Sequence, residues 1–138
     1  MDHFRRLVHT TRIPVRWGDM DAMGHVNNTI YFRYAEQSRI EWLESLGFSL
    51  DAGRDEAAVI VNASCTFLLP ITYPALVEVR LYVGQPGRSS VPTYYEMRCV
   101  GDDKLYAEGA AKVVWFHPAT GKSMELPTQI RALIESEK

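Results

Sequence analysis

The sequence predicts an α+β domain in which one long helix is wrapped by a mainly antiparallel, five-stranded sheet. Two hydrophobic patterns, one helical and one strand-like, carry this prediction. Apolar residues recur at helical spacing over 28–46, and from about residue 58 onward the hydrophobic pattern has a period of two. Short turn-like clusters of Gly, Pro, Ser and Asp separate the later segments, as is typical of antiparallel strands.

The length and composition predict one globular domain over residues 1–138. A chain of 138 residues has the length of a single domain and buries roughly 68% of its unfolded surface. Hydrophobic residues make up 46% and charged residues 23% of the chain, as in ordinary globular proteins. The sequence contains no internal repeat, linker or low-complexity segment.

Charge and hydropathy argue against nucleic-acid and membrane partners. The net charge is −2 and no basic run stands out. No apolar stretch has the length needed to span a bilayer, and residues 1–6 are not followed by the apolar region of a secretory signal. Cys65 and Cys99 lie in strand-like runs without CxxC spacing. We therefore expect free, buried thiols and a cytoplasmic protein.

The first two elements are a strand and the long helix. Residues 7–17 are extended in character, and Pro14 favours an edge position. The helix is expected over 28–46 and is ended by Gly47. Its core positions at helical spacing are Tyr31, Ala35, Ser38, Trp42 and Leu46.

Four strands and a short helix follow a polar loop at 51–56. The strands are expected over 58–69, 77–83, 91–100 and 105–116. Pro70 stops the first of them, and valines and leucine alternate with polar residues in the second. In the last strand the small residues Ala107, Gly109 and Ala111 leave room for a helix against the sheet. A C-terminal helix is expected from about Pro127.

Polar residues concentrate where the first strand ends and the long helix begins. Residues 19–28 read Asp-Met-Asp-Ala-Met-Gly-His-Val-Asn-Asn. Irregular backbone on a rigid scaffold is where reactive side chains are usually positioned. The helix start adds unpaired N–H groups that stabilise negative charge. A carboxylate beside such an anion site indicates acyl-transfer chemistry.

This motif and the order of elements resemble a known family. The order strand, helix, four strands, with Asp-x-Asp-x-x-Gly-His-Val-Asn-Asn before the helix, is similar to hot-dog-fold acyl-CoA thioesterases, especially the 4-hydroxybenzoyl-CoA thioesterase type. His-Val-Asn-Asn followed by Tyr31 also resembles plant acyl-ACP thioesterases. The similarity covers residues 11–116. It implies hydrolysis of an acyl-CoA to free acid and CoA without a cofactor or metal.

The resemblance also implies roles for residues of the motif. Asp21 matches the family's catalytic carboxylate, which acts as nucleophile or as general base for water. Amides near Asn28 would polarise the thioester carbonyl, and His25 would orient water or the carboxylate. The acyl-ACP branch has an Asn where this chain has Met23, which favours acyl-CoA as the substrate.

Binding residues and an oligomer are implied in the same way. Asn27 and Tyr31 are expected to contact the substrate, and Arg88 and Ser90 match positions that hold the CoA nucleotide. Arg98 is an alternative for the phosphates. Family members build their sites at a dimer interface, so we expect a homodimer or homotetramer with residues 59–64 along the dyad.

Structural alternatives exist for several of these residues. Asp21 is a poor candidate for a helix cap, because Asn27 or Asn28 lies nearer the helix start. Asp19 suits a structural hydrogen bond as well as catalysis, and Glu36 suits an exposed or interface position. A Cys65–His25 nucleophile pair is a minor alternative. The histidines lack metal-ligand spacing; they are His3, His9, His25 and His117.

Two other functions remain open. A hot-dog hydratase or dehydratase usually carries Gly-Asp-x-Asn-Pro-x-x-His, whereas this chain reads Gly18-Asp19-Met20-Asp21-Ala22 and lacks the proline. A non-catalytic acyl-binding regulatory module would be favoured by a missing catalytic acid, and Asp21 is present. The acyl group itself is not determined by these residues.

Overall fold

The computed structural model describes residues 4–48, 55–102 and 104–136. In chain order the elements are β1 (Arg6–Pro14), the 3₁₀ turn η1 (Trp17–Asp19), α1 (Asn28–Ser45), β2 (Ala57–Phe67), β3 (Leu76–Val83), β4 (Ser90–Cys99), β5 (Leu105–His117), β6 (Lys122–Ser123) and α2 (Thr128–Glu135). The predicted fold class is confirmed, and the two-residue β6 is an addition to it. His3, Asp103 and most of the predicted loop at 51–56 lie outside the described residues.

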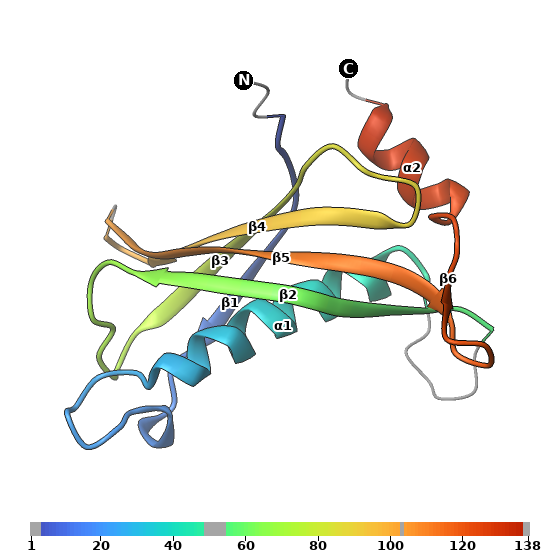
Figure 1. Cartoon of the computed structure of the whole chain (residues 1–138). Helices are drawn as coiled ribbons and strands as arrows, with labels where there is room; N and C mark the ends of the chain where they lie inside the picture. The colour runs from blue at the N-terminus through green and yellow to red at the C-terminus, as the bar shows by residue number, and fades with distance from the viewer. Residues whose placement is uncertain (1–3, 49–54, 103, 137–138) are drawn as a thin grey trace.

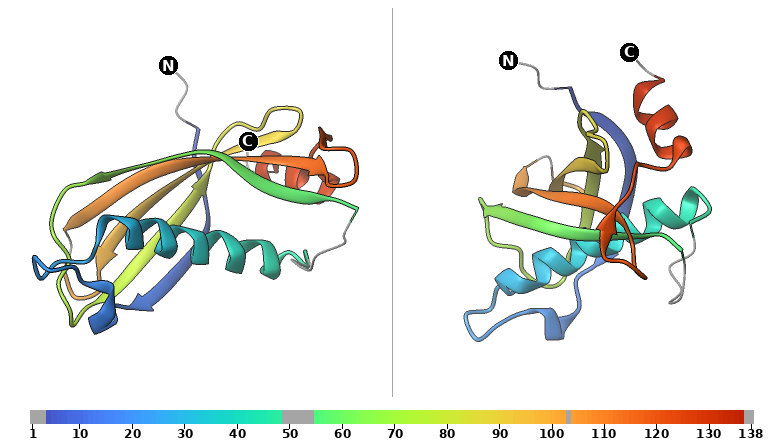
Figure 2. Two further views of the ribbon diagram at one scale, coloured as in Figure 1. Left: turned by 60° about the horizontal axis from the view of Figure 1, so that its bottom comes forward. Right: turned by 45° about the vertical axis from the view of Figure 1, so that its right-hand side comes forward.

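The sheet is antiparallel and α1 lies along its inner face (Figures 1 and 2). The strand order is β1-β3-β4-β5-β2, and β6 pairs with the end of β5. Among the described residues, strand β2 therefore pairs with β5 alone and is an edge strand. Side chains of α2 join those of α1 and the sheet in one buried cluster that includes Trp42, Leu81 and Ile130.

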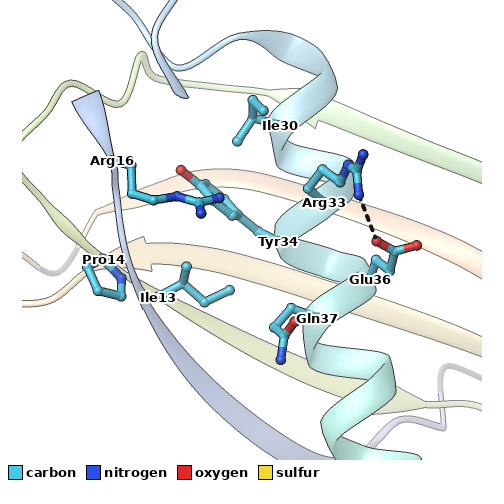
Figure 3. A pocket seen from close by; sticks show the side chains of 8 residues that line it. All are labelled: Ile13, Pro14, Arg16, Ile30, Arg33, Tyr34, Glu36 and Gln37. Carbon is cyan, nitrogen blue, oxygen red and sulfur yellow. Dashed lines mark ion pairs between the residues drawn. The ribbon is translucent and has the colours of Figure 1, made fainter. Parts of the chain in front are cut away.

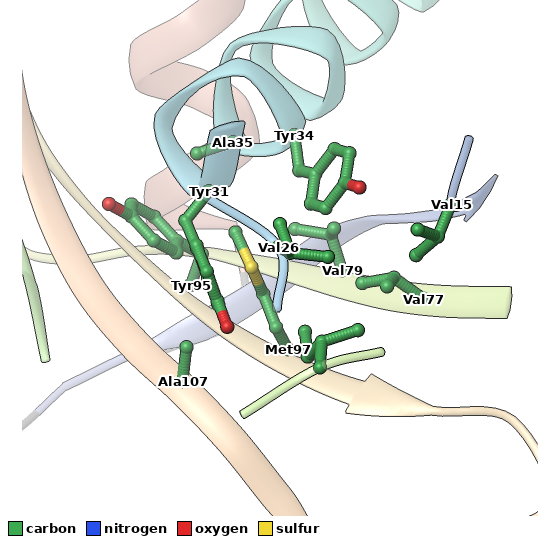
Figure 4. Close-up of a cluster of buried hydrophobic side chains, with 11 residues drawn as sticks. Val15, Val26, Tyr31, Tyr34, Ala35, Val77, Val79, Tyr95, Met97 and Ala107 are labelled. Carbon is green, nitrogen blue, oxygen red and sulfur yellow. The ribbon is translucent and has the colours of Figure 1, made fainter. Parts of the chain in front are cut away.

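The alternation of apolar and polar residues that the sequence predicts over 77–83 is present in β3. Its four inward residues are fully buried, and they are Val77, Val79, Leu81 and Val83. On β5, Ala107 belongs to the same buried cluster as Tyr31 and Ala35 of α1 (Figure 4). The space over Gly109 is instead filled by Tyr95, whose hydroxyl donates to the Ser64 carbonyl at 2.8 Å. The small-residue stripe thus accommodates an aromatic side chain as well as the helix.

Strand β1 is shorter than the sequence predicted. It was expected to reach Trp17, but it ends at Pro14, and Trp17 lies in η1 with 73% of its surface exposed. Val15 still donates to the Ala75 carbonyl at 2.9 Å. The next amide, that of Arg16, donates to the Asp19 carboxylate, so a side chain takes over from the sheet and the chain turns away.

The helix α1 begins at Asn28 as predicted and ends at Ser45, one residue before the predicted end. Asn27 is its N-cap, and the carboxamide oxygen accepts from the Thr29 amide at 2.9 Å. Gly47 follows the last turn with φ of +87°, a conformation that glycine adopts without strain.

Polar contacts also hold α1 against β1. The Glu41 carboxylate accepts from Thr11 and contacts His9 on β1, at 2.8 and 3.0 Å. Partial burial opposes ionisation of Glu41, but hydrogen bonds, led by that from Gln37, outweigh it, so the Glu41 pKa lies below its usual value.

Candidate active site

A cleft opens at the N-terminal end of α1, where the polar motif meets the end of β2. Its volume is about 280 Å³, and it is lined by Asp21, Met23, His25, Val26, Asn28, Tyr31, Phe67, Leu68, Leu69 and Pro70. Four residues expected from the sequence, Asp21, His25, Asn28 and Tyr31, thus lie around one cavity. The cleft therefore has a carboxylate and an apolar wall around the same cavity.

A tight turn presents Asp21 and His25 side by side. The Asp21 amide donates to the His25 carbonyl at 2.8 Å, and the Gly24 amide donates to the Asp21 carbonyl at 3.0 Å. Gly24 has φ of +79°, which favours glycine at this position of the turn. Asp21 is exposed, and its Oδ1 accepts from the Met23 amide at 2.9 Å. The second carboxylate oxygen accepts no hydrogen bond from the described residues.

The start of α1 offers a free backbone donor beside this turn. The Asn27 amide donates to the Asp19 carbonyl, the Thr29 amide to the Asn27 side chain and the Ile30 amide to the Asn27 carbonyl. Within the described ranges, the Asn28 amide has no hydrogen-bond acceptor. A free N–H at a helix N-terminus, supported by the helix dipole, suits an oxygen on which negative charge develops.

Tyr31 and Phe67 form an aromatic part of the cleft wall. Tyr31 has 2% of its surface exposed, and its ring meets that of Phe67 edge to face with 4.9 Å between centroids. Burial, ahead of other causes, raises the pKa of the Tyr31 hydroxyl above its usual value. Tyr31 therefore stays neutral and can donate a hydrogen bond at physiological pH.

Three of the predicted binding residues do not line the cleft. The Asn27 side chain is engaged in capping α1. Ser90 lines a separate hollow of about 440 Å³ at the start of β4, and exposed Arg88 lies in the preceding turn, where its carbonyl accepts from Leu126. Ser90 and Val59 pair with the same residue of β5, so they stand at the same level of the sheet. Phe67 lies eight residues further along β2, or roughly 26 Å at the rise of a strand.

A larger hollow lies on the other side of α1. It has a volume of about 650 Å³ between β1 and the helix and is lined by Ile13, Pro14, Arg16, Ile30, Arg33, Tyr34, Glu36 and Gln37 (Figure 3). Arg33 and Glu36 form an exposed ion pair of 3.7 Å across one turn of α1. Glu36 thus lies on the outer side of the helix and does not line the cleft of Asp21.

The thiol alternative receives no support from the geometry. Cys65 is half-buried on β2, and burial raises its pKa to about 11, which keeps the thiol protonated at neutral pH. No hydrogen bond joins Cys65 to His25 in the part of the chain that the structure describes. Among the same residues, no group of three or more His, Cys, Asp or Glu side chains has the arrangement of a metal site. None of the described helices is long and apolar enough to cross a membrane.

The wall formed by Phe67, Leu68, Leu69 and Pro70 was not identified as part of the site from the sequence. Phe67 and Leu68 are 41% and 46% exposed in spite of their apolar side chains. From the sequence, the apolar run that ends in Pro70 predicts only the end of a strand. Its place beside the motif follows from the pairing of the Val26 amide with the Ile71 carbonyl at 2.8 Å, which no sequence spacing indicates.

Comparisons with known proteins agree on one family. A family model described as the thioesterase-like superfamily matches residues 15–134. The structure of the PA2801 protein of Pseudomonas aeruginosa superposes with a TM-score of 0.90 and 45% identity, over 94% of this chain and 99% of that one. A candidate acyl-CoA thioesterase of Xanthomonas campestris superposes with a TM-score of 0.73 and 33% identity, over 80% and 93% of the two chains. The hot-dog fold expected from the sequence is thereby confirmed.

A relative among curated proteins matches over a shorter region. A candidate esterase of Aquifex aeolicus is 37% identical over 79 residues. The match covers 56% of this chain and 62% of the Aquifex protein, so the chain spans less than two thirds of that relative's length.

Proposed function

The chain belongs to the thioesterase-like superfamily and is a hydrolase of the thioesterase type; on that premise we propose that it hydrolyses an acyl-CoA thioester to a free acid and CoA. The observation that carries this proposal is the exposed Asp21 carboxylate beside the free amide of Asn28, in one cleft. A thioester has a good leaving group, so these two parts suffice without a serine–histidine pair.

In the proposed reaction the thioester carbonyl oxygen accepts a hydrogen bond from the Asn28 amide. Asp21 then acts in one of two ways. As a nucleophile, its free oxygen attacks the carbonyl carbon, the thiolate leaves, and water hydrolyses the resulting anhydride. As a general base, it takes a proton from water, whose oxygen attacks the same carbon as the thiolate leaves. His25, across the turn from Asp21, would orient the water in either route.

A panel of CoA thioesters tests this proposal. The panel contains short straight-chain, long straight-chain and aromatic acyl groups, and a thiol reagent detects the CoA released. We expect turnover of at least one class with kcat above 1 s⁻¹, the order typical of enzymes. An enoyl-CoA in the panel, followed by loss of its conjugated absorbance, would identify a hydratase. Binding of thioesters without turnover would contradict the proposal and favour an acyl-binding module.

We further propose that the active unit is a homodimer formed along β2. One backbone edge of this strand pairs with no strand of the described ranges, and its side chains Val59 and Val61 are 41% and 56% exposed. Arg39, on the side of α1 near Tyr95, is half-buried, and burial lowers its pKa. It has no hydrogen bond or ion pair with any described residue. The Glu36 carboxylate acts on it only at longer range, and a half-buried guanidinium without a directly bonded carboxylate is costly, which favours a partner from a second copy.

The same dimer would reconcile Arg88 and Ser90 with a role in CoA binding. Two β2 strands related by a two-fold axis run antiparallel, so the start of one lies beside the end of the other. Ser90 is aligned with the start of β2, and the cleft of Asp21 is at its end. In this arrangement the partner's copy of the turn at 87–90, and not the chain's own, approaches each cleft.

Charging the proposed interface is expected to separate the subunits. Val61→Asp puts a carboxylate at the bulge of β2. We expect a monomer by light scattering and at least a tenfold loss of thioesterase activity, because like charges meet near the dyad. The matched control is Leu7→Asp, at 49% exposure beside the bulge of the opposite edge strand, which should leave both properties unchanged. A wild-type protein that is monomeric while active would overturn the dimer.

A further inference from the structure

We infer that Asp19 and Tyr34 are positioning residues for Asp21, an inference that rests on the thioesterase function proposed above. Asp19 is 5% exposed and Tyr34 is 3% exposed. The Tyr34 hydroxyl donates to Asp19 Oδ2 at 2.8 Å, and the Arg16 amide donates to the same oxygen at 3.0 Å. Figure 3 shows the hydroxyl of Tyr34 reaching from α1 toward the chain at Arg16.

Asp19 lies at the neck of the loop that carries Asp21. Its carbonyl accepts from the Asn27 amide at 2.9 Å, and Met20 forms an isolated antiparallel bridge with Val26. These contacts close the loop immediately before Asp21 and immediately before Asn28. The neck therefore fixes the carboxylate and the free amide relative to each other.

The hydrogen bond from Tyr34 joins this neck to the body of α1. Among the side-chain hydrogen bonds of the described residues, it alone links residues 19–26 to the helix beyond its first turn. Burial and then the contact with Asp19 raise the pKa of Tyr34 above its usual value, so the phenol remains a neutral donor wherever the enzyme is folded and active. A shift of about 1 Å in a reacting group can cost about 100-fold in rate.

Tyr34→Phe is the first test, because it removes one hydroxyl and keeps the ring. We expect kcat on the best thioester to fall about tenfold, which corresponds to about 1.4 kcal/mol of transition-state stabilisation. The dissociation constant of a non-hydrolysable thioether analogue of that substrate should stay within about twofold, with one site retained per chain. Loss of sites per chain would indicate a purely structural role and overturn the inference.

The matched control is Tyr82→Phe. This substitution also removes a tyrosine hydroxyl that contacts a carboxylate, here Glu96 at 3.5 Å, and Tyr82 lies on β3 away from the cleft. We expect kcat and analogue binding equal to wild type. A tenfold loss in this control as well would show that the effect of Tyr34→Phe does not depend on Asp19.

Asp19→Asn provides a second route if Tyr34→Phe folds poorly. The amide keeps the shape of the carboxylate and its oxygen can still accept at the Oδ2 position, but it lacks the negative charge that strengthens the bonds from Tyr34 and from the Arg16 amide. We expect a similar fall in kcat, and the double variant should be within about twofold of the worse single variant, since both disturb one contact. If the losses in kcat of the two single variants multiply in the double variant, the inference is overturned.

Activities of three variants separate the positioning role of Asp19 and Tyr34 from the catalytic role of Asp21. If Tyr34→Phe and Asp19→Asn both keep wild-type kcat while Asp21→Asn is inactive, the positioning role is wrong and the thioesterase site stands. If Asp21→Asn is itself fully active, the site proposed above is wrong and the positioning role falls with it.

Discussion

Asp21→Asn is expected to lower kcat for thioester hydrolysis by about 1,000-fold, within the range of general acid–base catalysis. The amide oxygen can still accept from the Met23 amide, so the turn should keep its shape. What is lost is the negative charge and basicity of the free oxygen, which either route to hydrolysis requires. Steady-state release of CoA from the best substrate in the panel measures the effect.

The control for this substitution is Glu44→Gln. Glu44 is exposed on the last turn of α1, so the same exchange of carboxylate for amide is made away from the cleft. We expect wild-type activity for the control. Wild-type activity in Asp21→Asn would contradict the proposed mechanism outright.

A single turnover in water enriched in heavy oxygen then distinguishes the two roles of Asp21. If Asp21 is a nucleophile and water attacks the Asp21 carbon of the anhydride, one oxygen of Asp21 goes to the acid product and the heavy oxygen enters the Asp21 carboxyl group. A general base places the heavy oxygen directly in the product. Mass spectrometry of the peptide that contains Asp21, together with that of the acid, detects this exchange, and trapping with hydroxylamine during turnover detects an anhydride that is attacked at its acyl carbon.

Gly109→Ala is expected to destabilise the fold by about 3 kcal/mol, at the upper end of typical overpacking effects. A Cβ at this position would collide with the Ser64 carbonyl oxygen and would lie 2.5 Å from Cζ of Tyr95. The first neighbour is backbone of the paired strand, so relief requires β2 to move away from β5. Because β2 leads into the apolar wall of the cleft, activity should fall as well.

Urea unfolding of wild type and variant measures this loss of stability. Gly18→Ala is the control, because a Cβ there has no neighbour within 4 Å and the backbone has no positive φ. Its stability should lie within about 0.5 kcal/mol of wild type. If Gly109→Ala were as stable as wild type, β2 and β5 would be able to separate at little cost.

Local pattern was a reliable guide to the elements of this fold. The period-two pattern of 77–83 and the helical spacing after Asn28 predict β3 and α1, because burial of one face imposes a repeat on the sequence. The helix ends were predictable from Asn27 and Gly47, whose effects are local. Strand β1 ended early because the Asp19 carboxylate captures the Arg16 amide, a contact that strand propensity does not report.

Only part of the candidate site could be predicted from local sequence pattern. Asp21, His25 and Asn28 are near neighbours in sequence, so their meeting in one cleft follows from a single turn. Tyr34 is 15 residues from Asp19, and the contact depends on the angle at which the loop meets α1. Phe67 and its neighbours arrive from the far end of β2, and Arg88 and Ser90 lie beyond reach within one chain.

The sequence by itself determined the order of the elements, the ends of the long helix and the segment that carries the carboxylate, because each depends on contacts within a few residues. Tertiary structure decided which oxygen of Asp21 is free, which amide remains without an acceptor, and which apolar residues face them. Those properties depend on hydrogen bonds between segments that only the packing of α1 against the sheet brings together. The local sequence therefore determines which chemical groups the site contains, and the fold determines how they are placed.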